Sequence, residues 1–135
     1  MMASIDAIEG IGHKSATKLR KARVRTTQAL LKLGATKKGR RALAAASGIS
    51  EGSILEWVNR ADLMRVRGVG EEYSDLLEAA GVDTVKELRR RNPVNLLAMM
   101  IATNDKKRLV RRLPTESMVQ RWVEDAKQLP PVITY

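Results

Sequence analysis

Apolar residues recur along the chain at intervals of three and four, a spacing that places them on one face of an α-helix. The last such segment shows the pattern most clearly, with apolar residues at Met118, Val119, Trp122, Val123, Ala126 and Leu129. Residues typical of helix ends separate the segments. Gly81 fits a C-cap, and Thr84 with Glu87 fits a capping box. Asn92-Pro93 fits a cap followed by a first-turn proline. The pattern predicts an all-α protein.

The chain resembles itself at a distance of 58 residues, which aligns Ile8-Glu9-Gly10-Ile11-Gly12 with Val66-Arg67-Gly68-Val69-Gly70. A second block aligns at a distance of 65 and pairs Trp57 with Trp122 as two expected core anchors, so about seven extra residues lie inside the second copy. Each copy is expected to contain a helix, a Gly-X-Gly hairpin, a second helix, a short linking helix and a longer helix pair. We therefore expect a compact helical protein with one repeat at residues 1–64, another at 65–129 and an extended C-terminal tail at 130–135.

The composition excludes several classes of function. The chain has no Cys, which rules out disulfides, thiolate metal sites and thiol nucleophiles. It shows no signal peptide, and its longest apolar run, at 96–102, is far too short to span a bilayer. We expect a cytoplasmic protein that does not associate with membranes.

The net charge of +10 indicates a polyanionic partner. The charge is uneven: residues 1–60 hold 12 Lys/Arg against 4 Asp/Glu, whereas residues 61–135 hold 13 against 11. The two copies are therefore built alike but charged differently.

The first Gly-X-Gly hairpin has the chemistry of an anion site. Its glycines allow positive φ angles and close approach of a ligand to the backbone. A helix begins directly after them, so its free N–H groups and its dipole face outward and favour a phosphate oxygen. Lys14, Lys18 and Lys21 follow at spacings that share one helical face. The candidate nucleic-acid-binding residues are Gly10, Ile11, Gly12, His13, Lys14, Ser15, Lys18 and Lys21.

Gly10-Ile11-Gly12 with Ala16 matches the Gly-hydrophobic-Gly-x-x-x-Ala signature, so the segment resembles the helix-hairpin-helix DNA-binding proteins. The whole chain resembles a bacterial family of small stand-alone helix-hairpin-helix proteins that carries only an unknown-function label. This resemblance implies a fold of two tandem helix-hairpin-helix repeats and no activity. In more distant relatives, such as DNA ligases, paired hairpins grip duplex phosphates without reading base sequence.

The second hairpin keeps the glycines but follows them with Glu71 and Glu72, which repel phosphate and satisfy the helix dipole internally. This favours a structural hairpin. The candidate residues of a second DNA-binding site are Arg67, Gly68, Val69 and Gly70. The basic cluster at 37–41 extends the first surface or is simply a solvated face, and the spacing alone favours the latter.

No catalytic constellation is apparent. His13 is the one histidine and has no Ser, Cys or second His arranged around it, and the acids at 71–78 are more typical of a soluble face than of a metal site. We expect neither enzyme activity, nor a cofactor, nor a metal. The sequence favours a sequence-nonspecific protein that binds double-stranded DNA. The alternative is a non-catalytic protein-interaction module whose acidic hairpin, Gly68 to Asp75, docks a partner protein.

Overall fold

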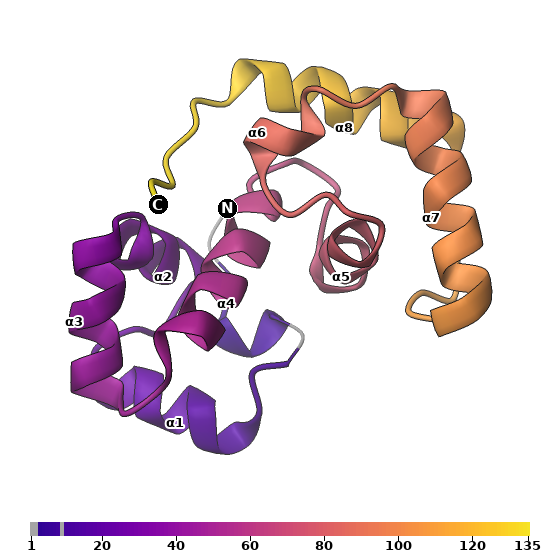
Figure 1. Cartoon of the computed structure of the whole chain (residues 1–135). Helices are drawn as coiled ribbons and strands as arrows, with labels where there is room; N and C mark the ends of the chain where they lie inside the picture. The colour runs from indigo at the N-terminus through magenta and orange to yellow at the C-terminus, as the bar shows by residue number, and fades with distance from the viewer. Residues whose placement is uncertain (1–2, 9) are drawn as a thin grey trace. The chain divides into compact units, whose positions relative to one another are not determined.

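The computed structural model describes residues 3–8 and 10–135. Met1, Met2 and Glu9, which belong to the first predicted repeat, lie outside the described residues. Within the described ranges the chain forms eight α-helices and one short 3-10 helix, with no strand beyond an isolated bridge between Ser4 and Thr26 (Figure 1). The predicted all-α fold is confirmed over these residues. The elements are η1 (Ile5–Ala7), α1 (His13–Lys21), α2 (Thr27–Gly34), α3 (Lys37–Ser47), α4 (Glu51–Leu63), α5 (Glu71–Ala79), α6 (Val85–Leu88), α7 (Pro93–Lys107) and α8 (Glu116–Gln128).

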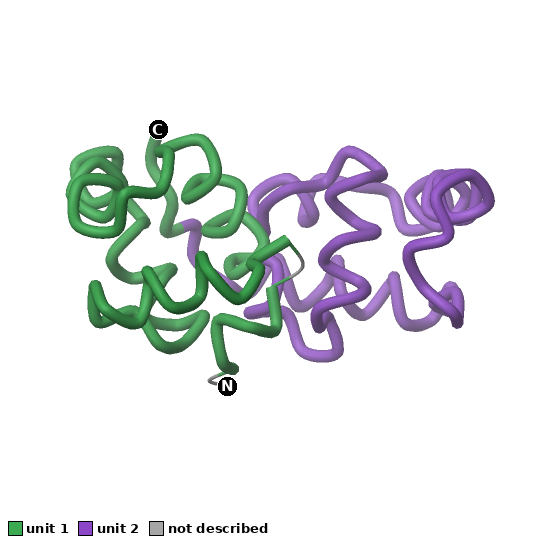
Figure 2. The backbone as a smooth tube through the Cα atoms, turned by 90° about the horizontal axis from the view of Figure 1, so that it is seen from below, with its two compact units in different colours: residues 1–62, 132–135 green, residues 63–131 purple. Residues whose placement is uncertain are grey.

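The chain divides into two compact units, which Figure 2 shows in different colours. Unit 1 comprises Met1–Asp62 and Val132–Tyr135, and unit 2 comprises Leu63–Pro131. Unit 1 therefore holds η1 to α3 and nearly all of α4, and unit 2 holds α5 to α8.

In unit 1, α2 packs on α3, and both α1 and α3 contribute buried apolar residues. Gly34 at the end of α2 lies against α4, since a Cβ at this position would come within 2.5 Å of Val58 Cγ2. Only glycine allows that approach. The buried apolar side chains of this unit include Ile5, Ile8, Leu19, Val24, Leu30, Ile54, Trp57 and Val58.

In unit 2, α8 packs against α6 and α7, and α5 packs against α7. The ring of Tyr73 lies 5.1 Å from that of Trp122, and its hydroxyl donates a hydrogen bond to Arg112 O. The apolar face predicted for the last helix is confirmed, because Val119, Trp122, Val123 and Ala126 are all buried. The other large buried side chains of this core are Leu63, Leu76, Leu77, Leu88, Leu96 and Met100.

The same backbone hydrogen bonds occur within each of the two units, and the equivalent residues are 58 positions apart in the sequence. Ile11 N donates to Ile8 O at 3.2 Å, and Val69 N donates to Val66 O at 3.0 Å. At the end of α1 and of α5, the bond from Val24 N to Leu19 O has its counterpart 58 residues on. Both Trp57 and Trp122 are buried, as expected of core anchors.

The predicted caps at Thr84 and Asn92 are present, although the Glu87 carboxylate accepts from Arg91 Nε instead of closing the capping box. The Thr84 hydroxyl accepts from Glu87 N, and the Asn92 side chain caps α7, with Pro93 in its first turn. Gly81 adopts a φ of 96° directly after the C-cap of α5. The helix expected before the first hairpin is only the 3-10 turn η1. Because residues three apart eclipse in such a turn, it directs both Ile5 and Ile8 into the core.

Residues 132–135 return to unit 1, where Arg40 binds them. Arg40 is buried on α3 and donates to three backbone carbonyls: Gly34 O at 2.9 Å, Ala35 O at 3.2 Å and Thr134 O at 2.7 Å. Thr134 N donates in turn to Ala35 O at 2.8 Å. The sequence predicted only an extended tail at 130–135, and the structure ties its last residues to Arg40 of α3 and to Ala35.

Replacing Arg40 with Leu should destabilise unit 1, because it leaves buried carbonyl oxygens without a donor. We expect the free energy of unfolding in urea to fall by about 3 kcal/mol. The neighbouring Arg41, whose side chain is 65% exposed, is the matched control, and Arg41→Leu should change stability by no more than about 0.5 kcal/mol. Equal effects of the two substitutions would contradict the structural role of Arg40.

Candidate nucleic-acid interface

The first predicted anion site lies where the turn before α1 meets the helix. Gly10 has a φ of 94°, a conformation that L side chains rarely adopt, and so it lets the chain reverse. Ile11 follows with its side chain buried, which fixes the turn against the core of unit 1. Gly12 is the N-cap residue, and its carbonyl accepts from Ala16 N at 2.9 Å to start the helix.

The N-terminus of α1 has no side-chain cap. A Ser, Thr or Asn side chain accepts a backbone N–H at the start of α2, α3, α6, α7 and α8, and Ser50 does so for Ser53 N in α4. Among the helices of the described residues, α1 and α5 alone begin at a glycine with no such bond. Space around Gly12 is open as well, because a Cβ there would meet nothing within 4 Å. The first-turn amides of α1 are therefore accessible to an external acceptor.

Basic side chains line the outer face of α1. Lys14, Lys18 and Lys21 are all exposed, as is His13, whereas Ser15 is partly buried. In the described part of the chain, no carboxylate forms an ion pair with any of these three lysines; Arg20, on the same helix, pairs with Asp6. All the predicted site residues from Gly10 to Lys21 thus lie on one continuous turn and helix.

The second hairpin has the same backbone geometry with opposite charge. Gly68 has a φ of 89°, Val69 is buried, and Gly70 is the uncapped N-cap of α5. Glu71 and Glu72 are exposed in the first turn of α5, where their negative charge interacts favourably with the helix dipole. Arg67 is exposed on the other side of the glycines.

The basic cluster at 37–41 does not form one surface. Arg40 is buried and serves the fold, and Arg41 lies 3.8 Å from a carboxylate oxygen of Glu51. Lys37 and Lys38 are exposed at the start of α3, but Thr36 already caps that helix by accepting from Gly39 N. The sequence analysis grouped Arg40 with the other basic residues of this cluster. Its buried position could not be predicted from the cluster, because its acceptors are carbonyl groups of the turn before α3 and of the distant residue Thr134.

A family model described as "Domain of unknown function (DUF4332)" matches residues 9–129 of the chain. The chain belongs to this family. Neither the curated proteins nor the solved structures contain a match to it. The family assignment carries no activity, so the argument for function rests on the site itself.

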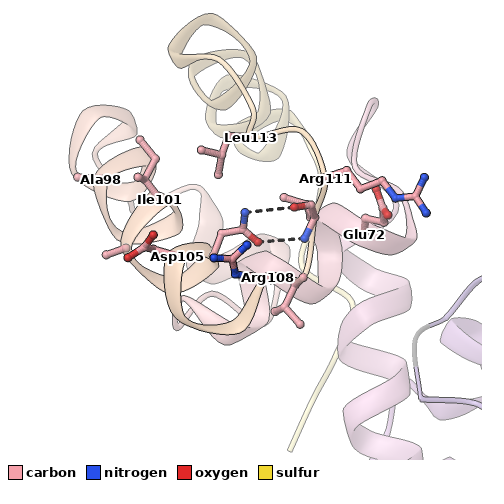
Figure 3. Close-up of a pocket in the computed structure, with 11 residues that line it drawn as sticks. Glu72, Ala98, Ile101, Asp105, Arg108, Arg111 and Leu113 are labelled. Carbon is pink, nitrogen blue, oxygen red and sulfur yellow. Dashed lines mark hydrogen bonds between the residues drawn. The ribbon is translucent and has the colours of Figure 1, made fainter.

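This DUF4332 chain also has a groove in unit 2 that the sequence did not predict (Figure 3). Its volume is about 820 Å³. The Asn104 side chain holds the loop beside it, donating to Val110 O at 3.2 Å and accepting from Val110 N at 3.0 Å. The lining residues are Glu72, Ala98, Ile101, Ala102, Asn104, Asp105, Arg108, Leu109, Val110, Arg111 and Leu113. The only sequence signal for it was the extra length of the second copy.

Over residues 3–8 and 10–135, no three His, Cys, Asp or Glu side chains come together in a way that could hold a metal ion, and this includes the acids of α5. No helix in those ranges has the length and apolarity needed to cross a bilayer.

The two glycines of the first hairpin should differ in their response to alanine. Gly10→Ala places a side chain at a φ of 94° and should lower the free energy of unfolding by about 1–3 kcal/mol. Gly12→Ala meets open space at an extended backbone and should be close to neutral. Urea denaturation of the two variants measures the difference, and a larger loss at Gly12 would show that the turn is described wrongly.

Proposed function

We propose that this protein binds double-stranded DNA through its phosphate backbone, without reading base sequence and without catalysing a reaction. The observation that supports this most strongly is the uncapped N-terminus of α1 beside three exposed lysines. Backbone amides and the helix dipole favour an anion at that end. The lysines add the counterion-release term that dominates nonspecific affinity for DNA.

The geometry of the turn is suited to a backbone ligand. Ile11 is buried beneath it, so the amides are held in place before a ligand arrives. Gly12 carries no side chain that would keep a phosphate from the amides. Phosphate contacts of this kind position a protein on a duplex but carry no sequence information.

The recurring hydrogen bonds and glycine φ angles support the interpretation of the chain as two tandem helix-hairpin-helix repeats. Contact with DNA would then come mainly from the first repeat. The second hairpin presents Glu71 and Glu72 at the position of His13 and Lys14, so a phosphate there meets two carboxylates. Arg67 offsets only part of that charge.

Replacing Lys14 and Lys18 together with Glu should weaken binding to duplex DNA by at least about tenfold, or about 1.4 kcal/mol. The change removes two phosphate contacts, so the slope of log affinity against log salt should fall by about two units. Fluorescence polarisation with two unrelated duplexes over a salt series measures both quantities. The two duplexes should give similar affinities.

The matched control replaces Lys37 and Lys38 with Glu, which makes the same change of net charge at the start of a helix that is already capped. This variant should keep most of its affinity. Equal loss in both double variants would reduce the effect to overall charge. A Lys14/Lys18 variant that stays folded and binds normally would refute the hairpin mechanism.

The Gly12→Ala variant distinguishes the contribution of the backbone amides to DNA affinity from that of the lysines. Because it leaves every charge in place, it should weaken DNA binding while the salt slope stays near its original value. A circular dichroism melt checks that the helix content is unchanged. Normal binding by this variant would remove the amides from the proposed site and leave only the lysine face.

A further inference from the structure

The groove of unit 2 lies at the segment that is longer in unit 2 than in unit 1, namely α7 and the loop after it. α7 has 15 residues and its counterpart α3 has 11. Both helices end at a left-handed residue, Gly48 in unit 1 and Arg108 in unit 2. From there the chain reaches the next cap at Ser50 in unit 1, but only at Thr115 in unit 2. The extra loop residues include four that line the groove, at 109–111 and 113.

The same helix exposes large apolar side chains. Val94 is 58% exposed, Met99 is 50% exposed and Ile101 is 44% exposed, and Leu113 of the following loop is 39% exposed. The exposed positions of α3 carry Lys, Arg and Ala instead. Ile101 and Leu113 both line the groove, and neighbouring apolar side chains on a surface are typical of an interaction site, whereas single exposed ones such as Met99 are ordinary.

The groove has an apolar floor and a preformed wall. Ala98, Ile101 and Ala102 fall on one stripe of α7, and Leu113 points toward that stripe from the loop (Figure 3). The two hydrogen bonds between Asn104 and Val110 fix the loop against the end of the helix. A ligand would therefore not need to order this wall on binding.

Two basic residues, Arg108 and Arg111, line the groove, and Lys106, Lys107 and Arg112 are their neighbours in the chain. Five basic residues of this region are exposed, and in the described part of the chain none of their side chains forms an ion pair. Only two acids, Glu72 and Asp105, line the groove. The exposed basic residues are Lys106, Lys107, Arg108, Arg111 and Arg112.

We propose that this groove binds a short, acidic, amphipathic helix of a partner protein. The apolar face of such a helix would cover Ile101 and Leu113, and its carboxylates would meet the basic side chains around them. Neither duplex DNA nor an anionic bilayer fits as well. DNA phosphates would gain nothing from the exposed apolar side chains of Ile101 and Leu113, and the flat surface of a bilayer does not match a groove. The surface is distinct from α1, so this proposal stands apart from DNA binding.

Selection of peptides on the full chain tests the proposal. A phage library of random peptides of about 16 residues, roughly four helical turns, is enriched on the immobilised protein, and the strongest binders are synthesised. They should carry net negative charge and apolar residues at helical spacing. In a titration of the isotope-labelled protein followed by NMR, they should shift amide signals of residues 98–113 and leave those of α1 in place.

Ile101→Glu should weaken these peptides by about tenfold or more, which is about 1.4 kcal/mol. Met99→Glu is the matched control: it makes the same charge change on the same helix at a more exposed position outside the groove, and it should leave affinity nearly unchanged. Arg111→Glu should also weaken the acidic peptides. Circular dichroism melts check that all three variants are folded.

Several results would overturn the proposal. They are a library that yields no binder, selected peptides that are basic or unpatterned, and peptides that bind the Ile101 and Met99 variants equally. The same holds if a short duplex DNA or phosphatidylserine vesicles, rather than any peptide, bind in a way that Ile101→Glu abolishes. Each of these outcomes leaves the DNA-binding experiments on α1 unaffected.

Discussion

In each unit, a glycine with positive φ lies against the indole of a buried tryptophan. A Cβ at Gly10 would come within 3.6 Å of Trp57 Nε1, and one at Gly68 within 3.2 Å of Trp122 Nε1. These tryptophans come from α4 and α8, the last helices of the two units, so the contact joins each hairpin to the last helix of its own unit. The hairpin glycine thus has two roles: it adopts a left-handed backbone conformation, and it allows the indole ring to lie close to the backbone. The direction of α1 and of α5, and hence of their free amides, depends on this packing.

One scaffold therefore carries two different surfaces. The hairpin geometry tolerates either charge in the first helical turn, because those side chains point to solvent and bear no core packing. Unit 2 accommodates a longer third helix, α7, and a longer loop after it for the same reason. Leu96 and Met100 of α7 stay buried. Unit 1 differs from unit 2 in the charge of its hairpin, and unit 2 differs from unit 1 in its groove.

Local signals in the sequence predicted the caps, the hairpins and the buried face of α8, because each depends on residues a few positions apart. Two features escaped prediction. Arg40 looked like part of a solvated cluster, yet one of its acceptors is Thr134 O. Nothing near Thr134 in the sequence indicated that bond. The groove required the loop after α7 to fold back on the helix, which a single pair of hydrogen bonds from Asn104 secures.

The uncapped helices also differ in how they satisfy their own dipoles. Glu71 and Glu72 stabilise α5 from within, by about 0.3–1 kcal/mol for each acid in the first turn. α1 has no acid in its first turn and no side-chain cap, so it forgoes that contribution. A bound anion would supply it from outside. A protein whose hairpins served only the fold would gain from an acid at His13 or Lys14, as it does in unit 2. The absence of one at α1 is thus a stability cost that anion binding would offset, and the charge difference between the two units supports the proposed binding of an anion at α1.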